Sequence, residues 1–209
     1  MLLNIKSTSM LEKINEIDTK LFLWLNGQHS PFFDQLMYWA SNKLFWIPFY
    51  AFLAYLLVRE YKRQSIYIFL SIGILITLCD QIASHVIKNV AQRLRPSHEP
   101  SLSGLIHLSD AGPGGRYGFI SSHSANAFGL ATFLILLLPK KYNTLKCVLA
   151  CWAVLVAYSR IYNGVHYPGD VIVAALLGIL LNYAVIRIYK YKFHENNNGN
   201  KNNNNTHLL

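Results

Sequence analysis

The stretch "VIVAALLGILLNYAVIRI", residues 171 to 188, decides the fold class, because its only charge is Arg187, close to its end. A helix crosses a bilayer with about 20 mainly apolar residues. Further apolar stretches occur at Leu44 to Val58, Ser65 to Lys88, Ala125 to Leu138 and Leu145 to Tyr162. In the whole chain of 209 residues, 53% are hydrophobic and only 14% are charged. We therefore predict an all-α, polytopic membrane helical bundle with about five transmembrane helices.

The segments on either side of this membrane domain, which we place at residues 44–190, have a different composition. Residues 1–43 mix charges with Leu, Phe and Trp at helical spacing and are broken near Asn26 and Pro31, a pattern typical of interfacial helices. The first residues lack the apolar core and cleavage site of a secretory signal. Residues 191–209 are polar and rich in Asn, which predicts a disordered tail.

The formal net charge of +9 comes from Lys and Arg residues in short loops beside the apolar stretches. This distribution is better explained by the orientation of the chain in a membrane than by binding to nucleic acid. The positive-inside rule places one set of loops in the cytoplasm. This set contains Arg59, Lys62, Arg63, Lys140, Lys141, Lys146, Arg187, Lys190 and Lys192. Residues 89–124 and 163–169 then lie on the extracytoplasmic side of the cytoplasmic (inner) membrane, together with the N-terminal helices.

Polar residues inside the apolar stretches have ordinary explanations. Cys79, Cys147 and Cys151 are expected to be small buried hydrophobes, because their spacing alone indicates neither a disulfide nor a metal site. Asp80 is a functional candidate, since carboxylates are costly within a membrane. Lys88 or a polar group on another helix would satisfy it, so we leave Asp80 outside the predicted site.

Four helix ends are expected to meet on the extracytoplasmic side. The polar residues at these ends are Lys88, Arg93, Arg95, His123, Arg160, His166 and Asp170. Two of the ends are helix N-termini, whose free N–H groups and dipole favour an anion. The guanidinium group of an arginine can bind two phosphate oxygens at once. The pattern predicts a site for a multiply charged oxyanion, and phosphate suits it best.

In "KNVAQRLRP", residues 88 to 96, Lys88 and Arg95 are seven residues apart. On a continuing helix ended by Pro96 they would share one stripe and hold one phosphate. An isolated cation at a membrane surface more often extends toward lipid headgroups, and we interpret Arg93 in this way.

Two histidines stand at predicted helix starts. His123 follows Ser121 and Ser122, which are residue types that often cap helices. A phosphate bound at this helix start would make His123 a proton donor. Without such a ligand, a histidine at a helix start is more often a polar surface residue. His166 precedes Asp170 by four residues, so the carboxylate can accept the Nδ1 hydrogen and leave Nε2 free to attack. Alternatively, His166 and Asp170 only cap the helix. Metal binding by this pair is a weaker alternative, because the surrounding cations would repel a divalent ion.

Together these motifs resemble those of the type 2 phosphatidic acid phosphatase superfamily of membrane lipid phosphatases. "KNVAQRLRP" is similar to KxxxxxxRP, and "SRIYNGVHYPGD", residues 159 to 170, to SRxxxxxHxxxD. "ISSH" resembles PSGH, with Ile120 in place of proline and Ser122 in place of glycine. The resemblance covers roughly Leu44 to Tyr189.

The resemblance implies a catalytic role for His166 as the nucleophile that forms a phosphohistidine, for Asp170 as the group that orients it, and for His123 as the general acid. It implies phosphate binding by Lys88, Arg95, Arg160, Ser121 and the backbone N–H of Ser122. It also implies that the reaction needs no metal and no cofactor.

The expected substrate is a lipid phosphate or diphosphate presented by the membrane. The resemblance suggests undecaprenyl diphosphate, with lipid A, phosphatidylglycerophosphate and phosphatidic acid as alternatives. A phosphotransferase would use the same intermediate, whereas a noncatalytic lipid-binding or transport protein would not need the His–Asp pair. The apolar stretches argue against the soluble haloperoxidases of the superfamily. The oligomeric state is open.

Overall fold

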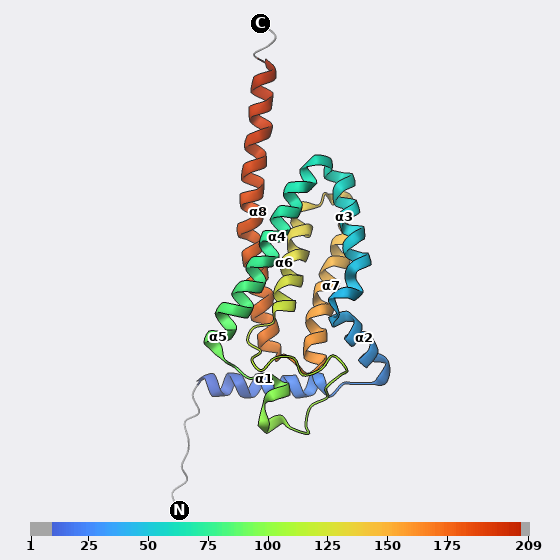
Figure 1. Ribbon diagram of the computed structural model, residues 1–209, viewed down its shortest axis with the longest axis vertical. Coiled ribbons are helices and arrows are strands. Elements are labelled where there is room, and N and C mark those ends of the chain that lie inside the picture. Colours follow the sequence, from blue (N-terminus) through green and yellow to red (C-terminus); the bar gives the residue numbers. More distant parts are fainter. Residues whose placement is uncertain (1–9, 206–209) are drawn as a thin grey trace, which may run out of the picture.

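The computed structural model describes residues 10–205, with side chains up to residue 192, and these residues contain helices and no strand. The main helices of the bundle are α3 (Ile47–Tyr61), α4 (Ser65–Gln81), α6 (Ser122–Leu137), α7 (Asn143–Tyr162) and α8 (Pro168–Asn205). They run side by side along the long axis of the molecule (Figure 1). The predicted all-α bundle is confirmed.

Within the described residues, three helical stretches are long and apolar enough to cross a membrane: Lys43–Ala91, Lys140–Tyr162 and Pro168–Lys192. The first contains both α3 and α4, which are joined by a tight turn at Lys62–Gln64. α6 adds a shorter apolar helix. α6 packs against α4, α7 and α8 and so occupies the centre of the bundle.

The two ends of the bundle differ in chemistry. The α3–α4 turn and the short link between α6 and α7 lie at one end, where the basic loops of the sequence gather (Figure 1). The α7–α8 loop and the long segment between α5 (Lys88–Ala91) and α6 lie at the other end, together with α1 and α2. The expected convergence of the motif-bearing segments is therefore present.

The N-terminal helix α1 (Met10–Asn26) lies across this second end of the bundle (Figure 1). One face of α1 contacts the α7–α8 loop through residues spaced by four positions: Asp18, Phe22 and Asn26. Phe22 is fully buried, and its ring centroid lies 5.4 Å from that of Tyr167. The other face exposes a row of apolar side chains: Met10, Ile14, Ile17, Leu21 and Trp24. The interfacial position of α1 stays a prediction.

α2 (Pro31–Ser41) begins at the predicted break and is followed by the short 3-10 helix Lys43–Trp46. The side chain of Ser30 accepts a hydrogen bond from the N–H of Phe33, so it caps the first turn, and Pro31 suits this position because it has no N–H to satisfy.

Of two further expectations from the sequence, the one for the cysteines needs correction. α8 spans Pro168–Asn205 and so runs past residue 190, where the sequence predicts that the polar tail begins; the disorder of that tail stays a prediction. Residues 206–209 of the expected tail lie outside the described residues. Among the cysteines only Cys79 is buried; Cys147 and Cys151 are exposed on α7, because they lie on the face of this helix that points away from the bundle.

α6 and α8 approach closely at Gly129 and Gly178. A Cβ atom on Gly178 would collide with the carbonyl oxygen of Ala125 and would lie 3.0 Å from the backbone nitrogen of Gly129. Small residues at helix crossings allow this backbone approach within membranes. The crossing of α6 and α8 therefore depends on the absence of a side chain at residue 178.

We expect Gly178→Ala to destabilise the protein by about 1–3 kcal/mol, because the added methyl group overpacks the α6–α8 crossing. Gly73→Ala is the matched control: a Cβ there meets nothing within 4 Å, and helix propensity favours Ala. Thermal unfolding in detergent measures both variants. Equal midpoints for the two would contradict the close crossing.

Candidate active site

The α7–α8 loop carries the buried polar groups of the candidate site. Arg160, His166 and Asp170 have 9%, 2% and 0% of their surface exposed. Gly164 reverses the chain with a positive φ of 75°, and a Cβ atom there would lie 2.7 Å from the carbonyl oxygen of His107. The glycine thus lets the loop pack directly on the segment before α6.

His166 and Asp170 lie beside each other, as their spacing predicts. The distance from Nδ1 of His166 to Oδ2 of Asp170 is 3.5 Å, and Nδ1 has no hydrogen-bond partner. Oδ2 accepts a hydrogen bond of 3.0 Å from the backbone N–H of Tyr167. The pair is in contact but is longer than a good hydrogen bond, and such distances often shorten when substrate binds.

Three cations lie close enough to His166 to affect its protonation. Burial lowers the pKa of His166 well below its usual value, and the positive charges of Arg95, Arg160 and Lys88 lower it further. Since the neutral form is favoured, the imidazole keeps a lone pair at neutral pH. A neutral imidazole among cations is chemically suited to attack a bound phosphate.

Lys88 and Arg95 reach the site from different segments, and the prediction that they share one helical stripe is wrong. The helix after α4 passes through a π-helical segment, Ile82–Ile87, and ends after Ala91 because Gln92 takes a left-handed conformation with φ 44°. Arg95 follows in a loop, where its N–H donates to Arg116 O at 3.1 Å.

The side chain of Arg95 is held against a glycine-rich loop. Its Nε donates a hydrogen bond of 3.1 Å to the carbonyl oxygen of Tyr117. A Cβ atom on Gly114 would collide with the guanidinium group, and one on Gly118 would lie 2.9 Å from Cγ of Arg95. Burial lowers the pKa of Arg95 from its usual value, although the charge of Asp170 opposes this. The loop therefore packs around a preplaced guanidinium group.

Arg160 is fixed by α2. Its Nη1 donates a hydrogen bond to Oγ of Ser41, the last residue of that helix. Its Nε is buried and has no hydrogen-bond partner, which leaves a donor for a bound anion.

The start of α6 is capped by Ser121, as the sequence predicts. Oγ of Ser121, fully buried, accepts from the N–H of Ser124 at 3.4 Å and from its hydroxyl at 3.0 Å. The Ser122 hydroxyl bonds to that of Ser84 at 2.8 Å, which ties α6 to the π-helical segment. His123, in the first turn, lines a mainly apolar cavity of about 410 Å³ between α3, α4, α6 and α7.

Arg93 was assigned to the membrane surface from the sequence, and this assignment is wrong. Its Nη1 donates to Oδ1 of Asp170 at 2.8 Å, and its Nη2 donates to Oδ2 of Asp18 at 2.7 Å. The sequence pattern gives no indication of a role for Asp18 either. Arg93 and Asp170 are 77 positions apart, so no local spacing could indicate the pair.

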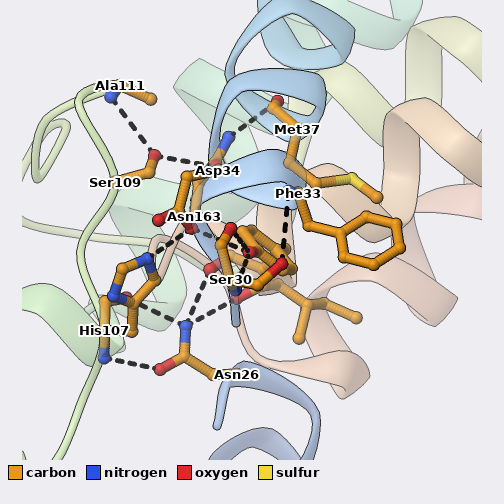
Figure 2. A network of polar contacts seen from close by, with 11 residues as sticks. Asn26, Ser30, Phe33, Asp34, Met37, His107, Ser109, Ala111 and Asn163 are labelled. Atoms are coloured by element: carbon orange, nitrogen blue, oxygen red, sulfur yellow. Dashed lines mark hydrogen bonds and ion pairs between the residues drawn. The ribbon is translucent and has the colours of Figure 1, made fainter. Parts of the chain in front are cut away.

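A second polar network supports the α7–α8 loop from the side of α2 (Figure 2). The side-chain amide of Asn26 donates to the carbonyl oxygens of Tyr162 at 2.8 Å and His107 at 2.9 Å, and its oxygen accepts from the N–H of His107 at 2.7 Å. His107 in turn bonds to Asp34 through Nε2 at 2.8 Å. One buried amide thus joins α1 to two chain segments.

Asn163 extends this network to α2. It accepts a hydrogen bond of 2.7 Å from the Ser109 hydroxyl and donates one of 3.2 Å to the carbonyl oxygen of Met37 (Figure 2). No group of three or more His, Cys, Asp or Glu side chains that could hold a metal ion occurs in the part of the chain that the structure describes.

Apolar helices end in a cluster of cations, with Arg160 buried and Lys88 and Arg95 half-buried, beside a neutral histidine, and this arrangement fits a membrane enzyme that acts on phosphate groups. The model of the PAP2 superfamily matches residues 66–194, and the chain belongs to this superfamily.

Relatives of known activity are similar over most of the chain. A lipid A 4'-phosphatase of Bacteroides thetaiotaomicron is 39% identical over 171 residues, which cover 81% of this chain and 75% of the relative. A lipid A 4'-phosphatase of Porphyromonas gingivalis is 34% identical, covering 87% and 76%. An undecaprenyl-diphosphatase of Sulfolobus acidocaldarius is 30% identical, covering 82% and 78%.

Among solved structures, LpxE of Aquifex aeolicus shares the fold with a TM-score of 0.58 at 24% identity, covering 88% of this chain and 99% of that one. A PAP2-type phosphatidylglycerolphosphate phosphatase from Bacillus subtilis gives a TM-score of 0.59 at 24% identity, covering 88% and 89%.

We expect Asn26→Ala to destabilise the protein by about 1–3 kcal/mol for each buried backbone group left unpaired. Ser101→Ala is the control, because the Ser101 side chain is bonded only to Glu99 at the surface. Thermal unfolding in detergent and limited proteolysis of the segment before α6 report the effect. A midpoint like that of the control would show that the network in Figure 2 does not support the loop.

Proposed function

We propose that this protein removes the 4'-phosphate from lipid A. The observation that carries the proposal is the 39% identity, over 171 residues, to a lipid A 4'-phosphatase. It replaces the expectation of undecaprenyl diphosphate, for which the corresponding relative is 30% identical. The latter lipid remains the second candidate.

In the proposed complex the phosphate lies among Lys88, Arg95 and Arg160. The unpartnered Nε of Arg160 supplies one donor, and the N-terminus of α6, with the Ser121 hydroxyl and the Ser122 N–H, supplies others. Cations and helix N–H groups fixed before the substrate arrives stabilise the charge that develops on the phosphoryl oxygens.

His166 then attacks the phosphorus through Nε2. A nitrogen–phosphorus bond forms as the bond from phosphorus to the sugar oxygen breaks. Burial and the neighbouring cations lower the pKa of His123 to about 2 in the free protein, and the negative charge of the bound phosphate opposes both effects. His123 takes up a proton as the phosphate binds and gives it to the sugar oxygen. Water next attacks the phosphohistidine, His123 takes the proton from the water, and inorganic phosphate leaves with His166 restored. Asp170 stabilises the imidazole orientation in both steps.

The cavity between α3, α4, α6 and α7 suits the lipid part of the substrate. It begins at polar groups, His123, Ser41 and Lys43, and continues past apolar side chains that include Leu53 and Leu134. An acyl chain can lie there while its phosphate reaches the cations. With the basic loops in the cytoplasm, the site faces the extracytoplasmic side of the inner membrane.

The substrate is tested with purified protein in one detergent. We expect phosphate release from bisphosphorylated lipid A and from its 4'-monophosphate, and little from the 1-monophosphate, undecaprenyl diphosphate or phosphatidylglycerophosphate. Mass spectrometry identifies which lipid A phosphate is lost. Faster release from undecaprenyl diphosphate would favour the second candidate, and transfer of labelled phosphate to another lipid would indicate a phosphotransferase.

We expect His166→Asn to lower kcat by about 10³-fold or more, because the covalent step loses its nucleophile. Acid-labile labelled phosphate trapped on the unmodified protein should be absent from the variant. His85→Asn is the control, since His85 is an exposed histidine on the π-helical segment. Phosphohistidine trapped on the His166 variant would remove this assignment.

A further inference from the structure

α1 reaches the candidate nucleophile through a chain of charged contacts. The guanidinium group of Arg93 joins two carboxylates, Asp170 through Nη1 and Asp18 through Nη2, at 2.8 and 2.7 Å. Asp170 is fully buried, whereas Asp18 and Arg93 keep only 11% and 22% of their side-chain surface exposed. Partly buried, charge-assisted bonds of this length are stronger and more directional than surface ion pairs.

Asp18 also caps α8. Its Oδ1 accepts a hydrogen bond of 2.7 Å from the N–H of Gly169, in the first turn of that helix. A Cβ atom on Gly169 would lie 2.8 Å from Oδ2 of Asp18, so the glycine permits the contact. One carboxylate on α1 thus binds both the start of α8 and the guanidinium group that holds Asp170.

The neighbouring aromatic groups hold Arg93 in place. The guanidinium carbon lies 4.0 Å from the ring centroid of Tyr167, and this ring packs edge-on against Phe22 of α1. Tyr167 also gives its backbone N–H to Oδ2 of Asp170. Oδ1 of Asp170 is therefore bound by Arg93 and Oδ2 by the Tyr167 N–H, so the carboxylate cannot rotate without breaking one of these bonds.

We propose that Arg93 and Asp18 are positioning residues for the nucleophile. They fix the carboxylate of Asp170 so that Oδ2 stays next to Nδ1 of His166, and α1 thereby becomes a working part of the site. The planar guanidinium fork holds the two carboxylates in one fixed geometry, whereas the ammonium group of a lysine is a single rotatable point charge. The inference rests on the proposed role of His166, and neither residue touches the substrate.

The decisive variants are Asp18→Asn and Arg93→Lys. Asp18→Asn keeps an oxygen for the Gly169 N–H but loses the charge that pairs with Arg93. Arg93→Lys keeps a charge beside Asp170 but loses the fork. Glu16→Gln is the matched control, because Glu16 is an acidic residue of the same helix that pairs only with Lys20 at the surface.

We expect kcat to fall roughly 10- to 100-fold in each variant, the range caused by a small misplacement of a reacting group. KM should stay within about twofold of the unmodified protein, because the phosphate-binding cations are unchanged. The double variant should be little slower than either single variant, since both remove the same link. Phosphohistidine should form more slowly in the variants, in proportion to kcat.

A merely structural link between α1 and α8 gives different results. Each variant would then lose activity only in proportion to its unfolded fraction, measured by thermal unfolding, and kcat per folded molecule would be unchanged. Either that pattern or unchanged kcat in Asp18→Asn overturns the positioning role. Asp18→Asn is conservative enough to fold, so the test does not depend on a disruptive change at Arg93.

The water-soluble substrate p-nitrophenyl phosphate separates this test from the proposed lipid substrate. If the unmodified protein hydrolyses it but not lipid A, the substrate proposal fails while the variants still test the link. Unmodified protein that hydrolyses neither compound would overturn both proposals.

Discussion

The pairing of the buried carboxylate of Asp170 is the constraint on which the candidate site depends. A fully buried, unpaired charge would cost several kcal/mol, so the chain must bring a partner to the first turn of α8. Arg93 is that partner, and it arrives from the loop after α5. Because Arg93 also pairs with Asp18, a single buried charge ties together the N-terminal helix, the loop before α6 and the start of α8.

The cations around His166 impose a second constraint. Lys88, Arg95 and Arg160 repel one another and depress the pKa of the imidazole they surround. Their mutual repulsion is tolerated because the carbonyl oxygen of Tyr117 accepts a hydrogen bond from Arg95 and the Ser41 hydroxyl accepts one from Arg160, and because a bound dianion would neutralise the cluster. In the proposed mechanism, the positive charges that act with burial to keep His166 neutral would also draw the phosphate toward it.

The sequence predicts the bundle well, because long apolar stretches and the distribution of basic loops are local properties. It also predicts which residues meet: His166 and Asp170 are one helical turn apart, and Ser121 caps α6. The link through Asp18 and Arg93 could not be found in this way, because ion pairs between residues 75 or more positions apart leave no periodic signal. The path of Arg95 was missed for a related reason: Gln92, not Pro96, ends the helix, and a left-handed non-glycine residue has no strong sequence signature.

The distance along the chain between Asp18 and Gly169 has a consequence for biosynthesis. These residues are 151 positions apart, so the acid is synthesised long before the helix terminus that it caps. The contact can form only after the intervening helices are in the membrane, because the entropy lost in closing so large a loop is offset only by contacts between its two ends. Asp18 lacks its Gly169 partner until α8 is made, whereas the other partners of α1, Arg93, His107 and Tyr162, are synthesised earlier. The cap on α8 is therefore among the last contacts to form, and the candidate site is completed only when the last helix of the bundle is in place.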